Sequence, residues 1–366
     1  PNKWKPAIKP ESGKKVAIIG AGPGGVSAAF FLRKEGHDID VFEASPKPGG
    51  WLRYGIPEYR LPNDILPKEV DNITELGVRI HYNKRLGDDI KYAELQKKYD
   101  AVILAIGSQK GTMIGVEGDD AENVFSGIDF LKEMEMTGKR YDFKGKKVAV
   151  VGGGNTAMDC CRTARRLGGE DVKVVVRSPR SEMKASEWEI EDALHEDIPI
   201  LENLTPLEFI IEDDRLTGMS FEKVKPVYDE QGKRKLVPTG EEPVILECDE
   251  VLLAIGQQNA FPFIEPESNI AFNDYGLPEL DPVTLQSSVP NVFFGGDSAF
   301  GPGNIIIAVA HGHEAAISID LLCRGEDLRN RPEPEVTLAG QKLGFHDWLY
   351  DSHVTEDERQ LVPMVD

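Results

Sequence analysis

Cysteine is scarce in this chain, where only Cys160, Cys161, Cys248 and Cys323 occur among 366 residues. No two of them form a C-x-x-C motif, so the sequence excludes the usual dithiol redox centre and the usual ligand spacing of an iron–sulfur cluster. Cys160 and Cys161 stand in a predicted helix, where we expect structural, buried thiols.

Long apolar runs are also missing, because no stretch approaches the roughly 18–20 apolar residues of a membrane helix. Residues 1–15 are polar and lysine-rich, without the apolar core of a signal peptide. Basic charge is in deficit, since 42 Lys and Arg stand against 63 Asp and Glu, a formal net charge of −21. This balance argues against nucleic acid or an anionic membrane as a partner, and we expect a cytoplasmic protein.

Catalytic side-chain constellations are absent as well. His311 and His313 are two residues apart on a predicted helix, so they face nearly opposite directions and cannot share one metal ion. His195 has no partner typical of a metal site, and no nucleophile–base pair is visible. We therefore assign no catalytic residue and no metal ligand, and expect bound cofactors to supply the chemistry.

Glycine, in contrast, forms two similar turns. The first follows the apolar run 16–19 and the second follows the apolar run 148–151, so that each places a strand, a tight turn and a helix start in succession. Backbone N–H groups and the helix dipole at such a turn bind a dinucleotide diphosphate. The residues of the two turns are Gly20, Gly22, Pro23, Gly24 and Gly25, and Gly152, Gly153, Gly154, Asn155 and Thr156. Two such turns predict two dinucleotides and electron transfer between them.

Strand and helix patterns alternate in both halves and predict an α/β fold with two nested Rossmann-like dinucleotide-binding domains. We expect residues 1–125 to begin the first domain, residues 126–258 to form the second, and residues 259–325 to complete the first. Residues 326–366 read as a peripheral tail, whose aromatic cluster at 345–350 is a candidate docking segment.

Polar residues follow the second strand of each predicted unit. Glu43 comes 23 residues after Gly20, where an acidic side chain binds the two hydroxyls of an adenosine ribose. The second unit has Arg177 and Arg180 instead, which favour the 2′-phosphate of NADP, as does Ala157 in place of a third glycine. Stacking of Arg177 on adenine without a phosphate is the alternative, so NAD stays open.

Several further motifs lie outside the two turns. Residues 49–62 read GGWLRYGIPEYRLP, the triplet Ala-Ile-Gly ends two predicted strands at 105–107 and 254–256, residues 154–159 read GNTAMD, and Gly296-Asp297 precedes the last helix. In these motifs the chain resembles the glutamate synthase small-subunit type of FAD/NAD(P) oxidoreductase over roughly residues 15–325. The motifs are specific for that family but not for one reaction.

The resemblance implies FAD in the first domain and NAD(P)H in the second. It implies that Asp297 hydrogen-bonds the ribityl chain and that the helix after Asn304 points its N-terminus at the flavin N1/C2 edge. It also implies further cofactor contacts, which in the first domain are Gly50, Leu52, Arg53, Ile56, Arg60, Ala105, Gly107, Gly296 and Ile305, and in the second Ala254 and Gly256.

One departure bears on partners. Relatives carry a cysteine-rich N-terminal domain that binds iron–sulfur clusters, whereas about 19 residues without cysteine precede Gly20 here. We expect electrons to pass to an iron–sulfur, ferredoxin-like subunit and a separate catalytic subunit of a glutamate synthase-like, aldehyde-oxidising or ferredoxin-linked complex. The lysine-rich start is either a docking arm or a solvated one. The direction of electron flow stays open.

Two other functions compete with this one. A self-contained flavin NAD(P)H reductase acting on a small organic substrate or a disulfide is the first, and the missing C-x-x-C argues against a disulfide reductase. A non-catalytic scaffold that keeps a bound flavin is the second, and the two intact glycine turns argue against it.

Overall fold

The computed structural model describes residues 6–213, 215–229, 231–232, 234–259, 261, 263–264 and 268–333. The chain divides into two units, Pro1–Arg329 and Asn330–Asp366, and the helices and strands described here belong to the first. The predicted aromatic docking cluster at residues 345–350 lies outside the described residues.

The first sheet is parallel throughout, with the strand order β16-β4-β1-β2-β3. Its central strands β4 and β1 are almost continuously apolar and buried, as expected where helices and loops cover both faces, whereas β2 also carries Asp38 and Asp40. β16 pairs with β4 although about 190 residues separate them in the sequence. The strands are β1 (Lys15–Ile19), β2 (Asp38–Phe42), β3 (Arg79–His81), β4 (Ala101–Leu104) and β16 (Val292–Phe294).

The second sheet repeats this arrangement, with the parallel order β6-β14-β7-β8-β9. Its strands come from the part of the chain between β4 and β16, which confirms the α/β class and the nesting of one Rossmann-like fold within another. They are β6 (Val124–Ser126), β7 (Lys147–Val151), β8 (Asp171–Val175), β9 (Ile200–Leu201) and β14 (Glu250–Leu253).

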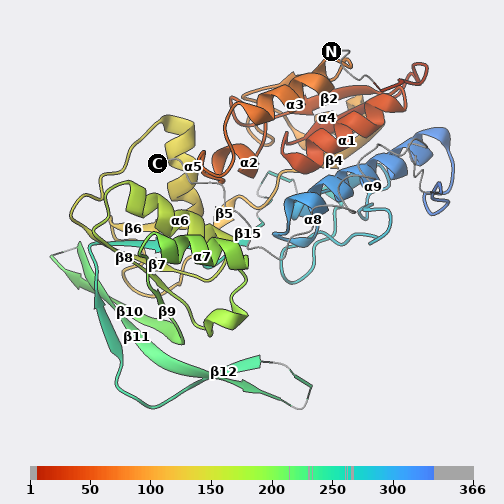
Figure 1. Cartoon of the computed structure of the whole chain (residues 1–366). Coiled ribbons are helices and arrows are strands. Elements are labelled where there is room, and N and C mark those ends of the chain that lie inside the picture. Colours follow the sequence, from red (N-terminus) through yellow and green to blue (C-terminus); the bar gives the residue numbers. More distant parts are fainter. Residues whose placement is uncertain are drawn as a thin grey trace, which may run out of the picture. The chain divides into compact units, whose positions relative to one another are not determined.

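Helices pack against each sheet (Figure 1). We call the part of the chain around the first sheet the first half and the part around the second sheet the second half. The helices of the first half are α1 (Pro23–Lys34), α2 (Trp51–Tyr54), α3 (Ile65–Thr74), α4 (Tyr92–Lys98), α8 (Asp297–Phe300) and α9 (Ile305–Arg324). The second half contains α5 (Gly127–Thr137), α6 (Asn155–Arg166), the 3-10 turn η1 (Arg180–Glu182) and α7 (Glu187–His195). The predicted helices after each glycine turn are confirmed to within two residues.

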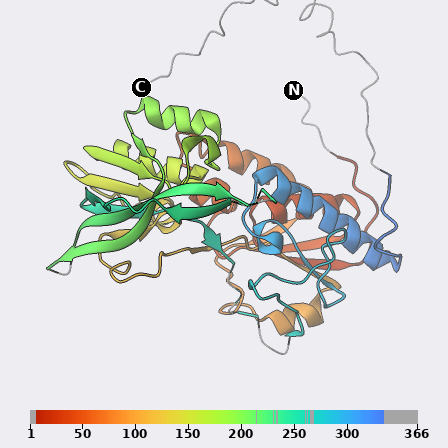
Figure 2. The same cartoon turned by 90° about the horizontal axis from the view of Figure 1, so that it is seen from below.

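Helix α9 corrects one expectation from the sequence. Over 18 residues its mean hydropathy is 1.5, so by length and composition alone it is long and apolar enough to cross a membrane. It lies beside α1 in both views (Figures 1 and 2), and Ala315, Ala316 and Ile319 are buried in the first core. A Cβ on Gly312 would come within 2.2 Å of the Gly24 carbonyl oxygen, so glycine allows the two helices this close contact. These contacts are those of a core helix.

An antiparallel sheet that the sequence pattern did not predict follows β9. It consists of β10 (Leu204–Glu212), β11 (Arg215–Tyr228), β12 (Arg234–Pro238) and β13 (Val244–Glu247), in which β11 pairs with the other three strands. Many of its side chains are half-exposed, so its strands lack the apolar runs that marked the parallel ones. A two-stranded ribbon of β5 (Lys110–Gly111) and β15 (Gln257–Gln258) completes the described strands.

Candidate functional site

The first glycine turn leads directly from β1 into α1. Gly20 has a φ of +103°, and a Cβ there would lie 2.4 Å from the Ala105 carbonyl oxygen, so only glycine fits. Gly22 is the N-cap of α1, and no side chain caps the helix. The N–H groups of the first turn therefore remain available for an anion, and the dipole of α1 favours negative charge at this end.

Glu43 lies at the end of β2 beside this turn. Its Oε2 accepts a hydrogen bond from the Ala21 N–H at 2.8 Å, and its Oε1 accepts one from the Ser45 N–H at 2.7 Å. The residue is only 7% exposed. Each carboxylate oxygen keeps a further lone pair, so the side chain can accept from ribose hydroxyls while it fixes the turn.

A cavity of about 630 Å³ opens along the turn, which is within the size range of small-molecule sites. Most of the residues predicted for the first cofactor line it, namely Gly20, Gly22, Pro23, Gly24, Glu43, Gly50, Leu52, Ile56, Ala105, Gly107, Gly296, Asp297, Asn304 and Ile305. Three predicted residues, Gly25, Arg53 and Arg60, are not part of the lining. Among the residues that the structure describes, neither cysteine nor histidine lines it.

Asp297 and the start of α9 form one part of the cavity wall. Asp297 Oδ1 accepts a hydrogen bond from the Gly303 N–H at 3.1 Å, and burial raises the pKa of this carboxyl. Asn304 is the N-cap of α9 but makes no side-chain capping bond, so the N-terminus of this 20-residue helix is uncapped where Asn304 and Ile305 line the cavity. The wall therefore offers one carboxylate acceptor and one helix terminus that favours negative charge.

Arg60 lies away from the cavity, in a buried ion network. Its Nη1 lies 2.6 and 2.8 Å from the two oxygens of Asp159, and its Nη2 lies 2.6 Å from Glu189 Oε1. Asp159 is the last residue of the predicted GNTAMD motif, on α6. The network thus connects the segment after α2 to helices of the second half.

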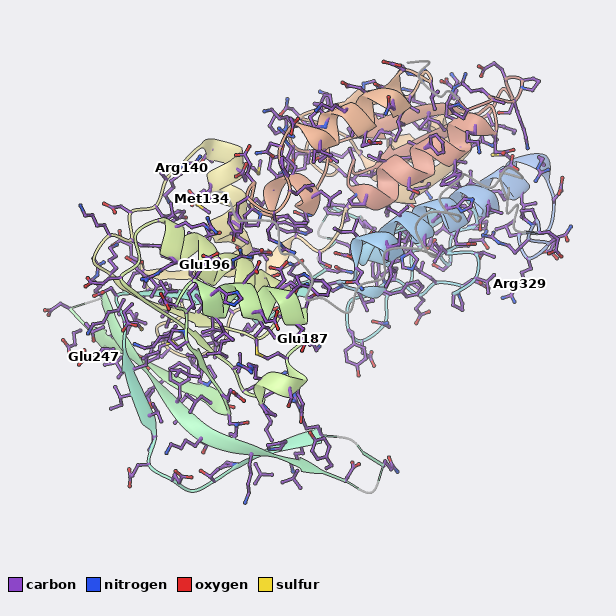
Figure 3. The ribbon with its side chains drawn as sticks, in the orientation of Figure 1. Met134, Arg140, Glu187, Glu196, Glu247 and Arg329 are labelled. Carbon is purple, nitrogen blue, oxygen red and sulfur yellow. The ribbon has the colours of Figure 1, made fainter. Side chains whose placement is uncertain are left out.

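Arg162 extends the network on the same helix. It pairs with Glu189 at 3.3 Å, with Asp192 at 3.0 Å and with Glu196 at 2.8 Å, and Glu196 is labelled at the end of α7 in Figure 3. The guanidinium groups of Arg162 and Arg166 lie over the Tyr59 ring, 5.1 and 4.3 Å from its centre. Burial raises the pKa of Asp159 to about 6 and outweighs the opposing effect of Arg60.

The second glycine turn reproduces the first. Gly152 has a φ of +144°, and a Cβ there would lie 2.2 Å from the Ala254 carbonyl oxygen, so the pair matches Gly20 and Ala105. Gly154 is the N-cap of α6 without a side-chain cap, and the space around its Cβ position is open. The Asn155 Oδ1 accepts a hydrogen bond from the Ser186 N–H at 2.8 Å.

The predicted residues of this second turn and its neighbours do not line the first cavity. They are Gly152, Gly153, Gly154, Asn155, Thr156, Arg177, Arg180, Ala254 and Gly256. Arg177 and Arg180 follow β8 and are exposed, and within the described part of the chain no carboxylate forms an ion pair with either guanidinium. Both cations are therefore available to an anionic ligand.

Several residues that the sequence did not single out also line the first cavity. Trp51 lies within the motif at residues 49–62, so this motif could have predicted that Trp51 lines the cavity. Gln109 is two residues past the first Ala-Ile-Gly triplet. Lys132 and Met136 lie on α5, in the other half of the chain, and carried no local signal.

The cysteines are remote from this chemistry. Cys160, Cys161 and Cys248 are buried and Cys323 is partly buried, and burial raises the pKa of each thiol. No cluster of three metal-ligating side chains occurs among the residues that the structure describes. His313 stacks on Phe31, whereas His311 meets Phe300 edge-on, so the two histidines have different neighbours.

Two glycine turns of this geometry define a two-nucleotide oxidoreductase fold, and solved structures share it. FprA from Mycobacterium tuberculosis in complex with NADPH superposes with a TM-score of 0.74 and 19% identity, over 87% of this chain and 85% of that one. Thioredoxin reductase from Lactococcus lactis superposes with a TM-score of 0.65 and 20% identity, over 85% and 99%. At these identities the likeness is one of fold.

Sequence similarity gives the family. The model for the pyridine nucleotide-disulphide oxidoreductases matches residues 14–312, and the chain belongs to this family. The glutamate synthase [NADPH] small chain of Escherichia coli K12 is 31% identical, over 86% of this chain and 70% of that protein. The NADP(+)-dependent formate dehydrogenase subunit beta of Moorella thermoacetica is 41% identical, over 92% of this chain and 48% of that protein.

These matches confirm the resemblance to the glutamate synthase small-subunit type. The chain is an FAD-dependent NAD(P)H oxidoreductase, with FAD and NAD(P)H as its cofactors. It spans about half the length of the first curated relatives that it matches, such as the formate dehydrogenase subunit.

Proposed function

We propose that this protein is an electron-transfer subunit, which exchanges a hydride with NAD(P)(H) through FAD and passes single electrons to an iron–sulfur partner in a larger complex. The observation that carries the proposal is the composition of the cavity. Its wall has a glycine turn, the carboxylates of Glu43 and Asp297 and a helix N-terminus, but among the described residues no thiol or imidazole. The described wall thus has no side-chain redox partner for a disulfide, which supports an electron acceptor outside the site.

The relatives support this proposal in kind. The matched protein of Moorella thermoacetica is a subunit of an NADP(+)-dependent formate dehydrogenase, and that of Geobacter sulfurreducens is a subunit of an NADPH-Fe(3+) oxidoreductase. A glutamate synthase-like, an aldehyde-oxidising and a ferredoxin-linked complex all fit the chemistry of the cavity. The iron–sulfur centres would belong to protein outside these 366 residues, since their cysteines have no suitable spacing.

We assign the cavity to FAD, and the sequence-predicted residues that line it to FAD binding. When bound, the flavin is what takes up a hydride and releases electrons one at a time. The first glycine turn would hold the diphosphate, and Glu43 the adenosine ribose. Asp297 would orient the ribityl chain, and the N-terminus of α9 would stabilise negative charge that develops on the reduced ring.

We assign the second turn to the nicotinamide nucleotide, and propose NADP(H) in preference to NAD(H). Arg177 and Arg180 stand exposed after β8, where they can form charge-assisted hydrogen bonds with a 2′-phosphate. The residues proposed to contact this nucleotide are Gly152, Gly153, Gly154, Asn155, Thr156, Ala254 and Gly256 in addition to the two arginines. The net charge of −21 and the burial of α9 in a core support a cytoplasmic location.

The test is a mild affinity purification from the native source, followed by analysis of flavin, iron and co-purifying subunits. The proposal expects bound FAD, bleaching of its colour by NADPH without oxygen, and an iron-containing partner. The isolated chain should turn over small organic substrates and disulfides slowly. Rapid turnover of such a substrate by the chain alone would favour the self-contained reductase, and a flavin that no nicotinamide nucleotide bleaches would favour the scaffold.

A further inference from the structure

One cation in the cavity wall comes from the other half of the chain. Lys132 lies on α5, whose Phe130, Leu131 and Met134 are buried in the core of the second sheet. Figure 3 labels Met134 on this helix. The Lys132 side chain nevertheless lines the same cavity as the first glycine turn. The second half of the chain therefore contributes a positive charge to the first cofactor site.

Lys132 has no ion-pair partner among the residues that the structure describes, although Asp129 and Glu43 are close enough to act on its charge. Its Nζ donates a hydrogen bond to Gln109 Oε1 at 3.1 Å and lies 5.7 Å from the centre of the Trp51 ring. Among the described residues no carboxylate lies within 4.0 Å of Nζ, in a chain that has 63 acidic residues. Burial lowers the pKa of Lys132, so the surroundings disfavour this charge. A half-buried, unpaired ammonium in a cavity wall is stabilised when an anion binds there.

The neighbours of Lys132 indicate which part of a dinucleotide it meets. The Trp51 ring, which lies 5.7 Å from the Lys132 ammonium, belongs to the residue after Gly50, and a Cβ on Gly50 would lie 3.1 Å from the Gly22 Cα in the glycine turn. The Trp51 indole N–H donates to the Ser108 carbonyl oxygen at 3.1 Å, which fixes the ring in this place. The turn is where the diphosphate is held by backbone N–H groups.

We propose that Lys132 binds the diphosphate of FAD from the side opposite the glycine turn. This proposal rests on the assignment of the cavity to FAD. The diphosphate is then held by N–H groups of the first half and by an ammonium of the second, so that binding of FAD links the two halves of the protein. Lys132 lies in neither glycine turn and in none of the motifs at 49–62, 105–107, 154–159, 254–256 and 296–297 that carry the resemblance.

The experiment titrates FAD into flavin-free protein carrying Lys132→Gln, Lys132→Arg or Lys97→Gln. Lys97 is an exposed lysine of α4 outside the cavity lining, so its substitution changes the net charge equally. We expect Lys132→Gln to weaken FAD binding about tenfold, the usual size of one charge-assisted contact, and the loss to shrink at high salt. Lys132→Arg should retain most of the affinity, and Lys97→Gln all of it. The midpoint potential of the bound flavin should not change.

Other outcomes would overturn the proposal. If Lys132→Gln and Lys97→Gln bind FAD equally, the lysine does not contact the diphosphate. If the potential of the bound flavin shifts while the affinity stays, the lysine acts on the ring instead. A loss of NADPH affinity with FAD affinity intact would place it at the other nucleotide. Should Lys132→Gln fail to fold, two measurements decide the question: Lys132→Arg should keep most of the FAD affinity, and the affinity of the wild type should fall as salt is raised. Loss of affinity in Lys132→Arg, or a wild-type affinity independent of salt, would overturn the proposal. Failure of the wild-type protein to take up flavin would instead refute the proposed function itself.

Discussion

Arg60 offers the sharpest test of how the two halves are held together. Its guanidinium contacts both oxygens of Asp159 at 2.6 and 2.8 Å and Glu189 at 2.6 Å, and these two carboxylates are only 7% and 5% exposed. Replacement of Arg60 by methionine keeps an apolar stem but removes the charge. Glu189 would keep Arg162 at 3.3 Å, whereas Asp159 would lose its hydrogen-bonded cation.

The expected cost follows from that asymmetry. Removing one partner of a buried ion pair lowers the free energy of unfolding by about 3–5 kcal/mol, because the other charge remains buried without a partner. Protonation limits this cost, since burial already raises the pKa of Asp159 from 3.8 to about 6. A carboxyl whose pKa is raised in the folded state favours folding below its unfolded pKa and loses that contribution as the pH rises through the folded pKa. The loss of stability in Arg60→Met should therefore be smaller near pH 5 than at pH 8.

Urea unfolding of Arg60→Met at pH 5 and pH 8 measures both effects. The double variant Arg60→Met, Asp159→Asn is the control, because it removes the stranded charge and should recover most of the stability at pH 8. Lys68→Met removes an exposed pair with Asp64 and should cost at most about 1 kcal/mol of stability. A loss below about 1 kcal/mol in Arg60→Met, or an equal loss at both pH values without recovery in the double variant, would refute the reasoning.

Three further predictions concern the cofactors and the thiols. Asp297→Ala should weaken FAD binding by about tenfold and release the yellow colour on gel filtration, because the cavity loses a half-buried carboxylate acceptor; full retention of flavin would contradict its assignment. Arg177→Glu should shift the preference from NADPH toward NADH by about tenfold, and an unchanged ratio of the two rates would remove Arg177 from the site. The thiols should resist iodoacetamide at pH 8 until urea is added, because burial raises the pKa of Cys161 and Cys248 to about 12 and that of Cys323 to about 11. Rapid labelling of the native protein would show that a thiol is accessible and reactive.

The parallel sheets and the helices after the glycine turns could be predicted from the sequence, because buried parallel strands are continuous apolar runs. Residues 16–19 and 148–151 lie in β1 and β7, and Gly20 and Gly152 have the positive φ that such turns require. The antiparallel sheet β10–β13 was missed, since its half-exposed strands lack the continuous apolar runs of the parallel strands. The apolar length of α9 was also misjudged from the sequence.

The sequence by itself determined the glycine turn and the position of Glu43, because β1, the turn, α1 and β2 follow one another directly in the chain. These are the parts of the proposed FAD site that local structure fixes. The tertiary structure decided which distant side chains complete the wall and which do not. Lys132 reaches the first cavity from a helix about 110 residues after Gly20, whereas Arg60, only 40 residues after it, turns to Asp159 instead. The positions of these long side chains depend on how the two halves pack together. That packing leaves no periodic pattern in the sequence, so the sequence could not predict it.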